Sequence, residues 1–165
     1  MHSIHHQVAI RAPLARVFRA LNDPAEIDAW WCPQDVTDTP DGLVMSHQAG
    51  PYGTVRLRVL RRDAATGVTW TCISQHPPDN PASAWTGTRL VFDLSECNSG
   101  AALVERAVSS TPIAALTTVD FRHEGYDLSH RFAGFNSWAW ALVLQALKQA
   151  CEAEADSGGR AGASR

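Results

Sequence analysis

Residues 117–151 read TTVDFRHEGYDLSHRFAGFNSWAWALVLQALKQAC, and this stretch organises the rest of the chain. It begins with an alternating segment in which Val119, Phe121 and His123 share one face, which predicts a strand. A polar turn follows, and the long apolar segment after it predicts a helix. At about 100° per residue, the apolar stripe of this helix lies within roughly 40° of Trp140. The stripe comprises Trp140, Leu144, Leu147 and Cys151. Such an apolar helix needs a sheet on which to lie.

The opposite side of the same helix carries a second apolar group. Phe135, Trp138 and Leu142 lie about 140–200° from Trp140, on the side expected to meet solvent. Three large apolar side chains there would form an exposed patch unless something covers them. The cover would be either residues 96–116 or a second subunit, and we hypothesise a homodimer or partner contact through this patch.

The segments before residue 117 predict further strands and two short helices. Alternating apolar residues predict strands at residues 4–10, 35–38, 43–48, 54–59, 68–72 and 88–95. Ala12-Pro13 starts a first helix, and Asn22-Asp23-Pro24 ends it and caps a second helix that reaches about Trp31. The period of residues 96–116 does not decide between an added hairpin and a short helix. Residues 1–152 are therefore expected to form a single domain, and the small, polar residues 153–165 a disordered tail.

Composition narrows the class of protein. The 165 residues are 45% hydrophobic and 19% charged, as in a soluble globular domain. The formal net charge of −3 argues against binding to nucleic acid or to an anionic membrane. No run approaches the ~18 apolar residues of a membrane span and no signal-peptide pattern is present, so we expect a cytoplasmic protein. The four cysteines lack CxxC spacing, which favours reduced thiols and predicts neither a structural metal nor a cofactor.

Five motifs occur in a fixed order along residues 4–152. They are Ala12-Pro13 with Val17-Phe18 and Ala20-Leu21, Asp23-Pro24 leading to Trp30-Trp31, Trp85-x-Gly87-Thr88, Phe121-x-His123-x-Gly125-Tyr126, and Trp140-x3-Leu144-x2-Leu147-Lys148. As a set they resemble the START/Bet v-like (SRPBCC) superfamily, and most of all bacterial proteins similar to the C-terminal domain of the heat-shock-chaperone ATPase activator. The resemblance implies an α+β helix-grip fold. In it, a curved antiparallel sheet of about six to seven strands wraps around a long C-terminal helix, and two short helices follow the first strand.

In such a fold, inward-facing aromatic side chains are candidates for lining a cavity between the sheet and the last helix. These cavity candidates are Trp30, Trp31, Trp70, Phe92, Phe121, His123 and Trp140. The alternative is that they only fill the core, as aromatic residues most often do. His123 would hydrogen-bond a ligand or serve as a general base, or it would be a structural histidine satisfied by the backbone or by Tyr126.

These observations lead to three hypotheses about function. No GxSxG, P-loop, GxGxxG or HExxH motif is present, and we assign no catalytic residue. Our leading hypothesis is therefore a non-enzymatic domain that binds a small hydrophobic or aromatic molecule. The resemblance implies, as one alternative, a protein-interaction module that contacts a chaperone. The other alternative is a cyclase-, aromatase- or hydrolase-like enzyme that uses polar groups of the cavity, as relatives in the superfamily do.

Overall fold

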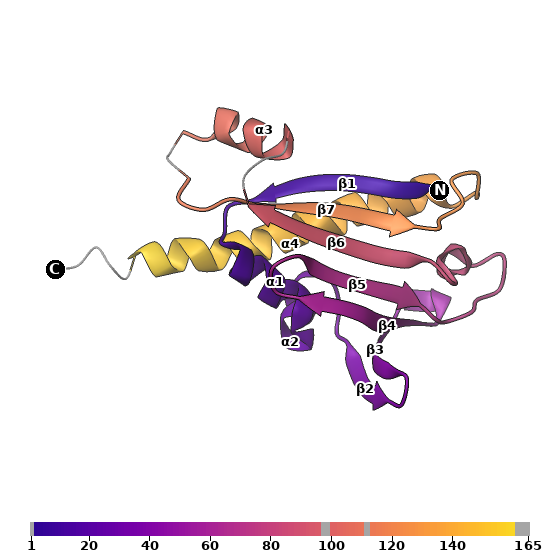
Figure 1. Ribbon diagram of the computed structural model, residues 1–165. Helices are drawn as coiled ribbons and strands as arrows, with labels where there is room; N and C mark the ends of the chain where they lie inside the picture. The colour runs from indigo at the N-terminus through magenta and orange to yellow at the C-terminus, as the bar shows by residue number, and fades with distance from the viewer. Residues whose placement is uncertain (1, 97–99, 111–112, 161–165) are drawn as a thin grey trace.

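The computed structural model describes residues 2–96, 100–110 and 113–160 (Figure 1). Within these residues the strands are β1 (Ser3–Ile10), β2 (Asp35–Thr39), β3 (Gly42–Gln48), β4 (Thr54–Asp63), β5 (Gly67–Cys72), β6 (Arg89–Glu96) and β7 (Thr117–Glu124). The α-helices are α1 (Leu14–Asn22), α2 (Pro24–Trp30), α3 (Gly100–Val108) and α4 (Ala133–Arg160). Two short 3-10 helices, η1 (Gly50–Tyr52) and η2 (Pro81–Trp85), complete the described elements.

The strands form one antiparallel sheet in the order β1-β7-β6-β5-β4-β3-β2. Strand β1 therefore lies beside β7, far away in the sequence, and His6 pairs with Phe121 (Figure 1). Helix α4 runs along one face of this sheet, while α1 and α2 lie near its middle, at the end where β5 begins. A seven-stranded antiparallel sheet with one long last helix and two short helices after β1 confirms the α+β architecture predicted from the sequence.

The apolar stripe of α4 is buried against the sheet as predicted. Trp140, Leu144, Leu147 and Cys151 are each at most 2% exposed and belong to the main hydrophobic core. Burying each leucine side chain contributes about 1.5–3 kcal/mol before the entropy of ordering is subtracted. The stripe is therefore the main attachment of α4 to the sheet.

Local signals in the sequence place α1 and α2. Pro13 precedes α1 with an extended backbone, and the carboxylate of Asp23 accepts a hydrogen bond from the Ala25 amide at 3.0 Å, which caps α2. The indole Nε1 of Trp30 donates to the Ala20 carbonyl oxygen at 2.8 Å and thereby joins the two helices. The side chain of Trp30 therefore packs in the core and holds α2 against α1.

The segment after β6 contains a helix, α3, which answers the question that the sequence left open. Ala102 of α3 packs with Ala9 and Leu116, on the side of β1 and β7 that faces away from α4. Glu105 forms ion pairs with Arg11 at 3.3 Å and with Lys148 at 3.1 Å. Helix α3 therefore covers one end of the sheet.

Helix α3 does not cover the α4 patch, which we define as Phe135, Trp138 and Leu142. These side chains are 53%, 65% and 53% exposed. Of the two covers considered for this patch, residues 96–116 are thus excluded as far as the structure describes them, and a second subunit is left.

The last helix extends further than its apolar stripe. The sequence predicts a tail from residue 153, but the backbone is helical to Arg160. Glu152 and Ala153 still favour helix, and the helix continues through them. Residues 161–165 lie outside the described residues, as does Cys97. Cys32, Cys72 and Cys151 form no disulfide bond among the described residues. None of the helices described here is both long and apolar enough to span a membrane.

Candidate functional site

A pocket of about 290 Å³ lies where α4 faces η1 and η2. It is slightly smaller than the 300–1,000 Å³ typical of small-molecule sites. Its wall consists of Trp31, Cys32, His47, Gln48, Ala49, Tyr52, Val55, Pro81, Ala82, Trp85, Phe135, Asn136, Ala139, Trp140 and Val143. The segments from α2 to β4 thus supply one side of the pocket, and η2 and α4 supply the other.

Three tryptophans form an aromatic surface in this pocket. The rings of Trp85 and Trp140 stack at 5.4 Å with 22° between their planes, and Trp31 lies 5.3 Å from Trp140. Trp85 is held in place because its Nε1 donates to the Oδ1 of the buried Asn136 at 3.0 Å. The three rings are therefore held by contacts within the protein, and they form a flat, apolar surface on the pocket wall.

The cavity candidates predicted from the sequence divide into two groups. Trp31 and Trp140 line the pocket. The others lie in the core, each at most 4% exposed: Trp30, Trp70, Phe92, Phe121 and His123. Phe92, for example, contacts the rings of Trp70 and Phe121 at 4.9 Å each. Alternation along a strand predicts which side chains face α4, but not whether other side chains already fill the space.

His123 is held by hydrogen bonds at both ring nitrogens. Trp140 Nε1 donates to Nδ1 at 3.2 Å, so Nδ1 is an acceptor and the neutral ring carries its proton on Nε2. Nε2 lies 2.7 Å from the hydroxyl oxygen of Thr88, and this hydroxyl donates to the Trp85 carbonyl oxygen at 2.5 Å. Burial lowers the pKa of His123 to about 3. The ring is therefore a neutral structural bridge that joins β7 to Thr88, just before β6, and to α4, with no nitrogen left for a substrate.

His47 is the histidine that lines the pocket, and the sequence reasoning missed it. Its ring lies 4.6 Å from that of Trp31, and its Nδ1 is 3.3 Å from Gln34 Oε1. Burial lowers the pKa of His47 to about 4, so the ring is neutral near pH 7. The signal was present in β3, because a two-residue period puts His47 on the same face as the buried Met45.

The other polar groups of the pocket are protonated or already engaged in hydrogen bonds. Burial raises the pKa of the Cys32 thiol to about 11, so it is protonated and a weak nucleophile. The amide of Asn136 is engaged with Trp85 and also donates to the Tyr126 hydroxyl at 2.6 Å. Among the described residues, no three His, Cys, Asp or Glu side chains come together as metal ligands.

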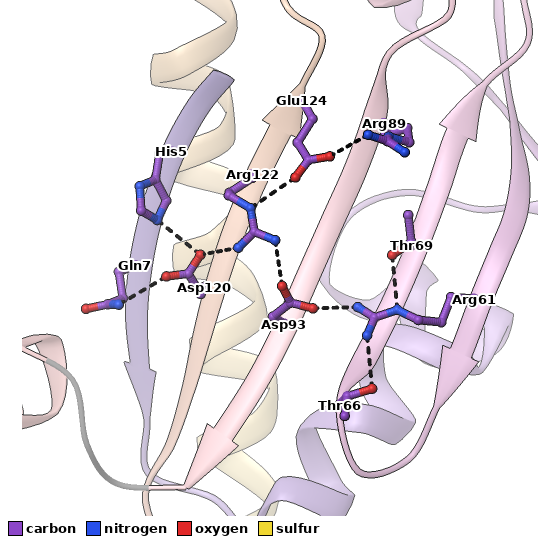
Figure 2. Close-up of polar contacts among 10 residues, drawn as sticks. All are labelled: His5, Gln7, Arg61, Thr66, Thr69, Arg89, Asp93, Asp120, Arg122 and Glu124. Atoms are coloured by element: carbon purple, nitrogen blue, oxygen red, sulfur yellow. Dashed lines mark hydrogen bonds and ion pairs between the residues drawn. The ribbon is translucent and has the colours of Figure 1, made fainter. Parts of the chain in front are cut away.

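The face of the sheet turned away from α4 carries a ladder of charges, shown in Figure 2. Asp93 on β6 accepts hydrogen bonds from Arg61 at 2.5 Å and from Arg122 at 2.6 Å. Arg122 also binds Asp120 at 2.8 Å and Glu124 at 3.2 Å, and the hydrogen bond to Asp93 raises its pKa further. The ladder continues outward to His5, Gln7, Thr66, Thr69 and Arg89. Because each charge has an opposite partner here, the ladder holds strands together and is a poor docking surface for a charged molecule.

No family model matches the sequence, and no curated protein matches it. Several solved structures match over most of the chain. The Aha1 dimer from Colwellia psychrerythraea has a TM-score of 0.66 and 22% identity, covering 92% of this chain and 97% of that one. Protein MLL2253 from Mesorhizobium loti has a TM-score of 0.62 and 17% identity over the same shares, 92% and 97%. Ara h 8.0201 has a TM-score of 0.56 and 11% identity, covering 92% and 98%. Because these identities are low, they support a conclusion about the fold alone. This chain has the helix-grip fold of the START/Bet v-like superfamily.

Proposed function

We propose that this chain is a binding protein that holds a small hydrophobic or aromatic molecule in the pocket between α4, η1 and η2. The observation that carries the proposal is the wall formed by Trp31, Trp85 and Trp140 around about 290 Å³ of space. An enzyme of the cyclase, aromatase or hydrolase type gains no support from His123, because both of its ring nitrogens are engaged.

Blocking the pocket tests this proposal. Ala139→Leu adds a larger side chain to the wall from α4, whereas Gln145→Leu adds the same side chain at an exposed position of the same helix. In NMR titrations with naphthalene and with decanol, we expect at least one probe to shift the pocket resonances of the wild type and of Gln145→Leu. Ala139→Leu should weaken that binding by roughly tenfold or more, because the added atoms occupy the volume of the ligand. The proposal fails if neither probe shifts the wild-type spectrum up to its solubility.

The exposed α4 patch suggests a second function, in which this surface contacts another protein. An exposed apolar group of Phe135, Trp138 and Leu142 is unusual on a helix whose other face is fully buried. One of the similar structures is that of a dimer. We propose that a second copy of this chain covers the patch, and the alternative occupant is a heat-shock chaperone of the kind that the family resemblance implies.

Sedimentation velocity tests the proposed homodimer. We expect a dimer at micromolar concentration for the wild type and a monomer for Trp138→Glu, because a charge cannot be buried there without a partner. Gln149→Glu introduces the same charge at another exposed position of α4 and should remain dimeric. A monomeric wild type would exclude the homodimer, and a pull-down with the chaperone would then test the alternative.

A further inference from the structure

Gln34 fixes the protonation of the His47 ring in the pocket. Gln34 Nε2 donates to the Cys32 carbonyl oxygen at 3.0 Å and to the Cys32 sulfur at 3.3 Å. These two acceptors orient the amide so that Oε1 faces His47 Nδ1 at 3.3 Å. An amide oxygen only accepts hydrogen bonds, so Nδ1 of His47 must carry the proton. In the neutral ring, Nε2 is consequently a bare acceptor.

This acceptor has no partner among the residues that the structure describes. The His47 side chain is only 7% exposed, so water has little access to it. The buried side-chain atoms that lack any partner belong to other residues, and hence Nε2 is not sealed inside the protein. An acceptor that faces the pocket and that no protein donor reaches can accept a hydrogen bond from a donor group of a ligand.

The pocket wall carries no formal charge near pH 7. It contains no Asp, Glu, Lys or Arg among the described residues, and its histidine is neutral. An anionic ligand would lose its hydration without meeting a cation, and a cationic ligand would lose its hydration without meeting a carboxylate. The wall therefore selects against ionised ligands as well as for apolar ones.

From these contacts we infer the ligand class of the pocket: an uncharged molecule with a flat apolar ring and one hydroxyl or N–H group that donates a hydrogen bond to His47 Nε2. The ring packs on Trp31, which lies directly beside the His47 ring. The inference deepens the proposed binding function and rests on it.

A series of four matched compounds tests the inference at neutral pH. Naphthol, methoxynaphthalene, naphthalene and naphthoate, substituted at the same ring position, differ in whether they donate a hydrogen bond and whether they are ionised. We expect naphthol to bind roughly three- to tenfold more tightly than methoxynaphthalene and naphthalene, as one extra hydrogen bond predicts. Naphthoate should bind at least about tenfold more weakly than naphthol, because its carboxylate must be desolvated.

His47→Phe keeps an aromatic ring of similar size and removes the acceptor. In this variant naphthol should lose its advantage and bind no more tightly than naphthalene does. A measurement on the wild type avoids any dependence on the folding of the variant. In the nitrogen NMR spectrum of the histidine rings, Nδ1 of His47 should be protonated, and the resonance of unprotonated Nε2 should shift when naphthol is added but not when methoxynaphthalene is added.

The outcomes separate this inference from the function on which it rests. If methoxynaphthalene binds as tightly as naphthol, or naphthoate binds most tightly, the inference is overturned and the hydrophobic binding function stands. If none of the four compounds binds but decanol does, the inference is overturned and the hydrophobic binding function stands; if decanol does not bind either, both are overturned. A ring of His47 protonated at Nε2 would also refute the inference.

Discussion

Lowering the pH from about 7 to about 5 should destabilise the folded protein through two buried histidines. Burial lowers the pKa of His123 from 6.5 to about 3 and that of His47 from 6.5 to about 4. The unfolded chain therefore binds protons that the folded chain does not, and stability falls as the pH drops below 6.5 towards these folded values. At pH 5 each histidine should cost about 2 kcal/mol relative to pH 7, or about 4 kcal/mol together. That is a large part of a typical stability of about 5–15 kcal/mol.

Urea unfolding followed by circular dichroism at both pH values, at constant ionic strength, measures this loss. His123→Gln and His47→Phe each remove one of the two groups, so each variant should lose only about half as much stability on acidification as the wild type. The comparison uses the change with pH, so a variant that is less stable at every pH is still informative. The reasoning is refuted if the wild type loses less than about 1 kcal/mol, or if both variants follow the wild-type curve.

Three further predictions concern stability, measured by urea unfolding near pH 7. Thr88→Val removes both hydrogen bonds of a buried hydroxyl and should cost about 2–3 kcal/mol, whereas Thr71→Val, at a half-buried site with one such bond, should cost less than about 1 kcal/mol. Gly67→Ala should cost at least roughly 3 kcal/mol, because φ is +113° and the new Cβ would lie 2.0 Å from a backbone carbonyl oxygen. Gly134→Ala, in helix α4 with open space around it, should instead stabilise the protein by up to about 1 kcal/mol. Asp93→Asn should cost about 1 kcal/mol at low ionic strength and less in high salt, because the Asp93 side chain is 37% exposed. An equal cost for the two members of a pair, or a salt-independent cost for Asp93→Asn, would contradict these assignments.

The fold was predictable because its signals are repetitive and local. The alternation of Val119, Phe121 and His123 predicted which face of β7 meets the helix. The spacing from Trp140 to Cys151 predicted the buried side of α4. Helix α3 was harder to predict, because its Leu103 and Val104 are exposed and blur the apolar period. The sequence pattern there did not distinguish a helix from a hairpin.

The pocket was less predictable, because it depends on how loops and side chains meet in space. Tyr52 and Pro81 reach the pocket from η1 and η2, whose positions follow from the whole sheet and not from a local pattern. Phe135 was assigned to the exposed patch, but its side chain also borders the pocket. His47 could have been added from its place in the alternation of β3, and Val55 from its place in that of β4.

The pairing of β1 with β7 has a consequence for how the protein is made. Ile10 pairs with Thr117, so the first strand acquires its neighbour only after about 110 further residues have been synthesised. At about 5–20 residues per second, a ribosome needs roughly 5–20 s to produce them. During that interval β1 has no place in the sheet, and in its last part, once β6 has been made, the edge of β6 that β7 will occupy is open. The nascent chain therefore passes through a period in which an unpaired strand edge is exposed to other proteins, and the last strand and helix end it together.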